Sequence, residues 1–159
     1  PVHRGPGTTP RERLLFDLAR RDKSNVRETF RAITEASAVF LDVSRVSIWE
    51  LVDEPDDERI VCKDLYLLDE RTHALHEPLH ARDFPTYFRA IREHRIITAD
   101  RAASDPRTAE YQESYLRPLG ITSMMDVPIW HAGRIYGVLC HEHQGPFRGW
   151  TSRAARARS

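Results

Sequence analysis

The first part of the chain spaces its apolar residues as helices do. Leu14, Leu15 and Leu18 form one stripe within residues 11–21, with charged residues on the opposite side. A longer stripe of the same kind predicts a helix over residues 25–41. A third stripe, from Phe84 to Ile91, predicts a shorter helix in which Pro85 occupies a tolerated first-turn position.

The apolar pattern then changes to one typical of strands. Residues 45–52 and 59–68 are rich in β-branched and aromatic side chains, and they are separated by an acidic turn that contains Pro55. We expect an antiparallel pair here, with a loop longer than the tight two-residue type. Residues 123–130 and 135–140 predict a hairpin with a short glycine-containing turn.

Smaller elements fill the middle of the chain. Residues 77–81 and 96–98 are compatible with brief strands, and residues 108–116 with a short helix. Helices at the front, strands afterwards and short helices between strands predict an α+β architecture in one domain.

Composition narrows the class of protein. The 24 Lys and Arg residues equal the 24 Asp and Glu residues, so no basic excess points to nucleic acid. No apolar run reaches the roughly 18–20 residues that a membrane span requires, and no secretory segment is visible. The two cysteines, Cys62 and Cys140, are too few for a disulfide framework, and a reducing cytoplasm is the expected compartment. The chain starts at Pro1 and has no Met before Met124, so we expect it to be a piece of a longer protein.

Four segments, in this order, resemble a known family of sensory domains. They are SRVSIWEL, DFPTYFRAI, DPRTAEYQESYLRPLGITSMMDVPI and GRIYGVLCHEHQGPFRGW. Together they resemble the GAF domain, in particular that of bacterial sensor histidine kinases and, more distantly, that of phytochromes. The resemblance covers residues 25–150. It implies a central antiparallel sheet of five to six strands with helices on both faces, one face holding a small-molecule pocket.

This resemblance sets the expected domain organisation. Residues 1–24 would form a lead-in and an N-terminal linker helix, residues 25–150 the GAF domain, and residues 151–159 a tail towards a missing output domain. The linker helix of such domains often pairs across a two-fold axis, so a homodimer through the N-terminal helices is expected. The stripe Leu14, Leu15, Leu18 is also compatible with a helix packed on its own sheet.

The residues before Tyr115 bear on chromophore chemistry. Plant-type phytochromes carry a chromophore-bearing Cys followed by His just before the corresponding Tyr. This chain has Tyr111 and Gln112 there, so it offers neither a thiolate nor an imidazole. That argues against covalent bilin attachment and leaves the identity of any cofactor unknown.

Strand alternation selects the residues that face a pocket. Along 123–130, Met125, Val127 and Ile129 are uniformly apolar and suit the helix-covered face, so Met124 and Asp126 should face the pocket. The resemblance directs Trp49, Asp83, Tyr87 and Tyr115 to the same space, and we add His141 as a candidate contact. Aromatic walls and carboxylates suit a flat or polar small ligand. Alternatively, the aromatic residues simply fill the core and Asp126 meets an arginine or a backbone amide.

Metal and catalytic chemistry are weakly supported. His141 and His143 share one strand face and could begin a zinc site, but a third ligand is not evident from the sequence, and whether they bind metal stays open. His73, His76 and His80 would need a helix that Pro78 interrupts. The fold also hosts a thiol-based reductase, yet neither cysteine lies in a recognisable reactive motif.

The sequence therefore predicts a non-enzymatic, small-molecule-sensing or signal-relay domain of a bacterial signal-transduction protein. A sensor histidine kinase of a two-component system is the expected parent. The alternatives are a ligandless dimerisation and relay module and, with less support, a metal-binding sensor or a thiol-based reductase. No catalytic residue and no metal ligand is assigned.

Overall fold

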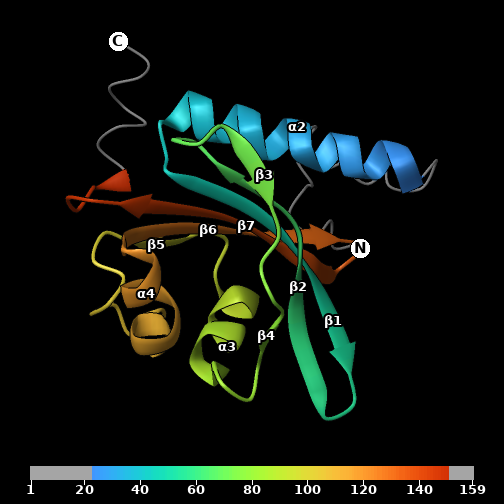
Figure 1. Ribbon diagram of the computed structural model, residues 1–159. Helices are drawn as coiled ribbons and strands as arrows, with labels where there is room; N and C mark the ends of the chain where they lie inside the picture. Colours follow the sequence, from blue (N-terminus) through green and yellow to red (C-terminus); the bar gives the residue numbers. More distant parts are fainter. Residues whose placement is uncertain (1–22, 151–159) are drawn as a thin grey trace, which may run out of the picture.

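The computed structural model describes residues 23–150, which form one antiparallel sheet with helices on both of its faces (Figure 1). The sheet order is β3-β2-β1-β7-β6-β5, and β4 pairs with β2 as a seventh strand. The strands are β1 (Arg45–Glu54), β2 (Asp57–Leu67), β3 (Thr72–Ala74), β4 (Leu79–His80), β5 (Ile97–Ala99), β6 (Ile121–His131) and β7 (Arg134–Gln144). The predicted α+β class with helices on both faces is confirmed, and the unpredicted short strand β3 raises the strand count to seven.

One face of the sheet is covered by a single long helix, α2 (Lys23–Leu41). Its buried residues Phe30 and Ala38 pack on Ile48, Val46 and their neighbours from β1, β6 and β7. The helix predicted over residues 25–41 is therefore confirmed. The helix predicted over residues 11–21, with Leu14, Leu15 and Leu18, lies outside the described residues.

The opposite face carries α3 (Pro85–Glu93) and a continuous run of short helical turns. The run comprises a 3₁₀ turn η1 (Ala109–Tyr111), a π-helical turn η2 (Gln112–Leu116) and α4 (Arg117–Leu119). Pro118 explains the wide π turn, because a proline removes the bond to the carbonyl four residues earlier and crowds that carbonyl. Gly120, with φ of 68°, ends the run in the left-handed conformation. π turns concentrate at functional sites, and this one carries Tyr115.

Two hairpins set the register of the sheet. The β6–β7 turn has Ala132 at φ 49° and Gly133 at φ 75°, as a two-residue turn with both φ values positive requires. The β1–β2 loop is also only two residues long, so the expectation of a longer loop is wrong. Asp56 adopts φ 64° after Pro55, which lets the chain reverse within Pro55–Asp56.

The larger core cluster lies on the α3 face, between the sheet and the helices that cover it. It contains Trp49 of β1, Tyr87 and Phe88 of α3, and Met124 of β6. Among the described residues, no helix is long and apolar enough to cross a membrane.

Candidate functional site

A fully buried carboxylate lies at the centre of the α3 face. Asp126 is 0% exposed on β6, and its Oδ2 accepts a 2.5 Å hydrogen bond from the Tyr87 hydroxyl on α3. Cys140 lies directly across the strand pair, with its Sγ 3.8 Å from the same hydroxyl. Burial raises the pKa of Asp126 to about 7, although Tyr87 and, more weakly, the Cys140 thiol and the His141 backbone N–H oppose that shift by donating to the carboxylate. The carboxyl group is therefore poised between its two protonation states near neutral pH.

A second buried hydroxyl, that of Tyr111, lies among aromatic rings beside this carboxylate. The Tyr111 ring stacks on Phe84 at 4.2 Å between centroids and meets Tyr87 edge-on at 4.9 Å. Within residues 23–150, neither the Tyr111 hydroxyl nor Asp126 Oδ1 has a well-formed hydrogen bond. Buried polar atoms without partners are rare, because each costs about 1–3 kcal/mol.

The polar cluster continues along β7 to Glu142. Glu142, 1% exposed, accepts a hydrogen bond from Arg45 Nε at 3.3 Å. Tyr115 interacts with both of these side chains. Burial raises the pKa of Glu142, and Arg45 acts against that shift. We call the buried polar side chains on this face the Asp126 cluster: Arg45, Tyr87, Tyr111, Tyr115, Asp126, Cys140 and Glu142.

Residues 75–83 form a strap over one side of the Asp126 cluster. His76 of the strap places its ring 5.7 Å from Trp49 and 5.2 Å from Tyr115. The Trp49 indole donates its N–H to Ser47 Oγ at 2.7 Å, so this ring is fixed in place. The strap therefore shields the cluster from solvent with an imidazole that is itself half-buried.

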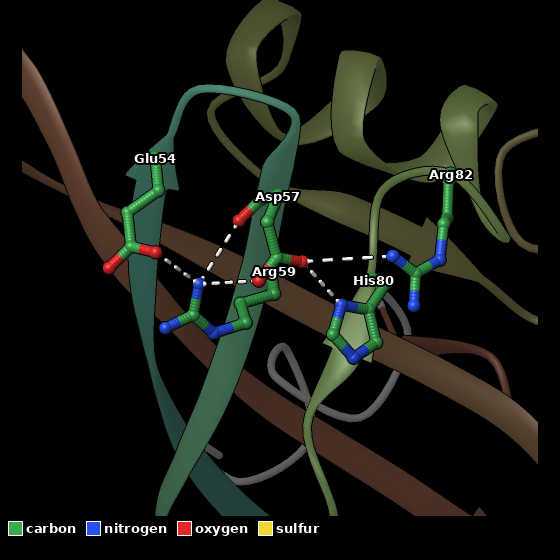
Figure 2. Close-up of polar contacts among 5 residues, drawn as sticks. All are labelled: Glu54, Asp57, Arg59, His80 and Arg82. Carbon is green, nitrogen blue, oxygen red and sulfur yellow. Dashed lines mark hydrogen bonds and ion pairs between the residues drawn. The ribbon is translucent and has the colours of Figure 1, made fainter.

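The strap is held at its far end by the tip of the β1–β2 hairpin (Figure 2). The Asp57 carboxylate contacts His80 Nδ1 at 2.8 Å and lies 4.0 Å from Arg82. Arg59 binds the same carboxylate at 3.0 Å and Glu54 at 3.2 Å. The hydrogen bond with His80 is the main reason that the pKa of Asp57 is lowered. These contacts are at the surface, so they position the strap more than they stabilise the fold.

Five of the seven predicted site residues come together on the α3 face, and two do not. Trp49, Tyr87, Tyr115, Met124 and Asp126 are buried in this region. Asp83 is exposed, because it precedes α3 with its side chain in solvent.

His141 is buried but belongs to the other face. Asp126 pairs directly with Cys140, so residue 141 must alternate to the α2 side. There His141 Nδ1 contacts the Met125 carbonyl at 2.9 Å, and burial lowers the pKa of His141 to about 4. This environment suits a neutral structural histidine.

Four members of the Asp126 cluster are not among the predicted site residues: Arg45, Tyr111, Cys140 and Glu142. Tyr111 had been noted only as the residue that replaces a chromophore-bearing Cys. Glu142 shares a strand face with Cys140, so alternation places it in the cluster once the pairing of Asp126 with Cys140 is known. Arg45 opens β1 opposite Glu142, a pairing that only the register reveals.

The thiols and imidazoles of the described residues do not assemble into reactive or metal-binding groups. Burial raises the pKa of Cys62 to about 11 and that of Cys140 well above its usual value, whereas a nucleophilic thiol needs a lowered pKa. Within residues 23–150, no three His, Cys, Asp or Glu side chains are arranged to hold a metal ion. His73, His76 and His80 each contact different partners.

A surface hollow of about 420 Å³ lies on the α2 side of the sheet. It contains none of the seven predicted site residues. Its lining is Glu35, Val39, Asp42, Tyr66, Leu68 and Arg71.

The family assignment follows from comparison with known proteins. The family model described as GAF domain matches residues 25–157. The chain belongs to the GAF domain family. The predicted recognition is therefore confirmed, over nearly the span that the four sequence segments indicated.

Solved structures of GAF domains share this fold. The phycocyanobilin-bound GAF domain of a cyanobacterial phytochrome superimposes with a TM-score of 0.63 at 18% identity, covering 96% of this chain and 89% of that one. The GAF domain of an Acinetobacter phosphoenolpyruvate-protein phosphotransferase gives 0.57 at 16% identity, covering 93% and 84%. That of a two-component sensor histidine kinase from Bacillus halodurans gives 0.50 at 20% identity, covering 72% and 73%.

At these identities, the likeness establishes the fold and not the ligand. A search of curated protein sequences finds no significant match.

Proposed function

We propose that this GAF domain is a sensory domain of a bacterial signalling protein and that it binds a small molecule at the Asp126 cluster. The single observation that carries the proposal is a pair of buried polar atoms, Asp126 Oδ1 and the Tyr111 hydroxyl, that lack a well-formed hydrogen bond within residues 23–150. A ligand that bonds to them relieves a penalty that the empty fold bears. Functional sites are places where proteins retain such a defect.

The sheet offers a direct mechanical route from this site to α2. Asp126 faces the cluster, while its neighbour Met125 packs against the α2 side of the same strand. Likewise, Cys140 faces the cluster, and Leu139 packs with Phe30 and Ala38 of α2. A ligand that shifts β6 and β7 would therefore move the α2 interface, and it would bias an output domain if it prefers one arrangement.

The wider context of the proposal is a cytoplasmic signalling protein, with a sensor histidine kinase as the preferred parent. Solved neighbours include the GAF domain of such a kinase and bilin-bound GAF domains. Tyr111 and Gln112 argue against covalent bilin attachment here, so the proposed ligand is non-covalent and unidentified. We propose no catalytic role for the domain, in keeping with the buried cysteines of raised pKa.

Native mass spectrometry of protein purified gently from lysate tests ligand binding. We expect a bound small molecule on the wild type and its loss from Asp126→Asn. Met125→Leu is the matched control, because Met125 is a neighbour on the opposite face, and that variant should keep the ligand. Recovery of only unliganded wild type, with no ligand found by soaking, would contradict the sensing proposal.

A second candidate function is a ligandless dimerisation and relay module, and one observation favours it. Val39 and Phe40, near the end of α2, are 61% and 77% exposed. Large exposed apolar side chains next to each other suit a partner surface. We propose a homodimer through the N-terminal helical region, although residues 11–21 lie outside the described residues. Sedimentation of the wild type and of Phe40→Ser would show a dimer that this variant weakens.

A further inference from the structure

The Asp126 cluster has a marked chemical bias, which sets what it can bind. Of the described side chains in the cluster, Arg45 is the cation, and it is already bonded to Glu142. The remaining ionisable groups are the acids Asp126, Cys140 and Glu142 and the tyrosines. An anionic ligand would meet two buried carboxyl groups with no uncommitted cation from the cluster, which is strongly unfavourable in a site of low polarity.

The walls of the cluster favour positive charge. Phe84, Tyr87 and Tyr115 surround Tyr111, with ring centroids 4.2, 4.9 and 5.5 Å from its own. The faces of such rings attract cations, and the attraction grows when water is excluded. The unpartnered Asp126 Oδ1 accepts a hydrogen bond and cannot donate one while ionised.

We propose that the ligand of the Asp126 cluster is an organic cation carrying N–H groups, such as an amine, amidine or guanidine on a flat apolar body. This inference rests on the proposed sensing function. The cationic N–H would donate to Asp126 Oδ1, and the apolar body would lie against the Tyr111 and Phe84 rings. Ionised Asp126 disfavours phosphate- or carboxylate-bearing ligands.

Proton linkage follows from this geometry. The groups that face Asp126 are Tyr87 from α3, Tyr111 from η1, and Cys140 and Glu142 from β7. Burial raises the pKa of Asp126 to about 7, so a cation must bind the ionised form in competition with a proton. Affinity for a cation should therefore be constant above pH 7 and should fall as the pH drops below it.

The two methionines of the chain provide an internal control for the test. Met124 and Met125 are adjacent, but Met124 packs in the α3-face core and Met125 against α2. In methyl-¹³C-methionine protein, a ligand at the Asp126 cluster should shift the Met124 methyl resonance and leave that of Met125 nearly unchanged.

Three probes of matched shape separate charge from size: benzamidine, benzamide and benzoate. At pH 8 we expect benzamidine to shift Met124 with an affinity at least about tenfold higher than benzamide, and benzoate to cause no shift. Asp126→Asn should lower benzamidine affinity about tenfold and leave benzamide within about threefold. Repeating the wild-type titration at pH 5.5 needs no variant, and benzamidine affinity should fall about thirtyfold relative to pH 8.

The outcomes separate this inference from the proposed function. Benzoate binding as well as benzamidine, or benzamidine affinity insensitive to both pH and Asp126→Asn, overturns the cation inference and leaves ligand sensing intact. If no probe shifts Met124, the charge of a molecule retained from lysate decides: a cation supports the inference and an anion overturns it. No probe shift together with no retained molecule overturns both proposals.

Discussion

The two faces of this sheet treat buried polar groups in different ways. On the α2 face, Asp64 Oδ2 accepts a hydrogen bond from Thr34 Oγ1 at 2.6 Å and contacts His73 Nδ1 at 2.8 Å, and among the described residues neither Asp64 oxygen is a buried atom without a partner. On the α3 face, Asp126 Oδ2 accepts the Tyr87 hydrogen bond, whereas Asp126 Oδ1 is buried without a well-formed hydrogen bond from any described residue. Both carboxylates are at least nine-tenths buried, so burial alone does not account for the difference.

The difference indicates where the fold has been optimised for stability and where it has not. The Asp64–Thr34 hydrogen bond on the α2 face joins the helix to the sheet, although the buried Trp150 indole N–H in the same core has no partner within residues 23–150. Unpaired groups on the α3 face lower stability and are retained at the place where a ligand can bond to them.

The largest effect is expected at Gly137 of β7. This residue packs tightly against β1, and the β1–β7 pair carries residues of both faces. A Cβ at this position would lie 1.8 Å from the Trp49 carbonyl oxygen. We expect Gly137→Ala to destabilise the fold by more than about 4 kcal/mol, or to prevent folding, because backbone must move. Gly133→Ala is the control: its Cβ meets nothing within 4 Å, and its φ of 75° should cost only about 1–2 kcal/mol. Urea denaturation measures both, and equal effects would refute the steric argument.

Acid should weaken the α2 face through His141. The folded-state pKa of His141 is lowered to about 4. The contribution of neutral His141 to the free energy of unfolding is therefore complete above pH 6.5 and declines as the pH falls towards 4. The loss amounts to about 3 kcal/mol at 1.36 kcal/mol per pKa unit. His141→Gln keeps a donor for the Met125 carbonyl and should flatten this part of the pH profile. An unchanged acid limb in denaturation curves would show that other groups cause it.

The same substitution on the two faces should have opposite signs. Asp64→Asn should destabilise by about 2 kcal/mol, since it weakens charge-assisted bonds to Thr34 and His73. At pH 8, Asp126→Asn should stabilise by about 2 kcal/mol, since it removes a buried charge and keeps an acceptor for Tyr87. Chemical denaturation of both variants at pH 8 measures the pair. If both variants were destabilised, the contrast between the faces would be lost.

The smallest effect is expected at Asp57, whose surface contacts hold the strap to the β1–β2 hairpin. Asp57→Ala removes contacts with His80, Arg59 and Arg82, all of which reach solvent (Figure 2). Exposed pairs contribute little, so the free energy of unfolding should hardly change. Amide exchange in residues 75–83 should nevertheless accelerate, because the strap loses its far attachment. Unchanged exchange would mean that β4 pairing alone holds the strap.

Much of the fold could be predicted because local patterns determine it. The alternation of Met124 and Met125 assigned both faces of β6 correctly, and helical spacing located α2 and α3. The burial of Asp126 also followed from alternation. The expected extra length of the β1–β2 loop was wrong, because the φ of Asp56 is not visible in a polar sequence.

The site was harder to predict because it depends on register between distant strands. Only the pairing of Asp126 with Cys140 shows that Glu142 shares the site and that His141 does not. The Arg45–Glu142 pair joins residues 97 positions apart. Asp83 lies in a segment that resembles the family, yet the direction of its side chain depends on how α3 begins. Ligand binding by any of these residues stays a prediction.

The most direct test of the contrast is the difference in free energy of unfolding between Asp126→Asn and wild type from pH 5 to pH 8. The folded-state pKa of Asp126 is raised to about 7. The stability that the protonated Asp126 contributes is therefore fully present below about pH 3.8 and is lost as the pH rises through 7. We predict that the stability advantage of the variant grows steadily over this range and levels off above pH 7. If the free energies of unfolding of the two proteins changed with pH in parallel, ionised Asp126 would not destabilise the fold. That result would contradict the claim that the α3 face is less stable because it is built for binding.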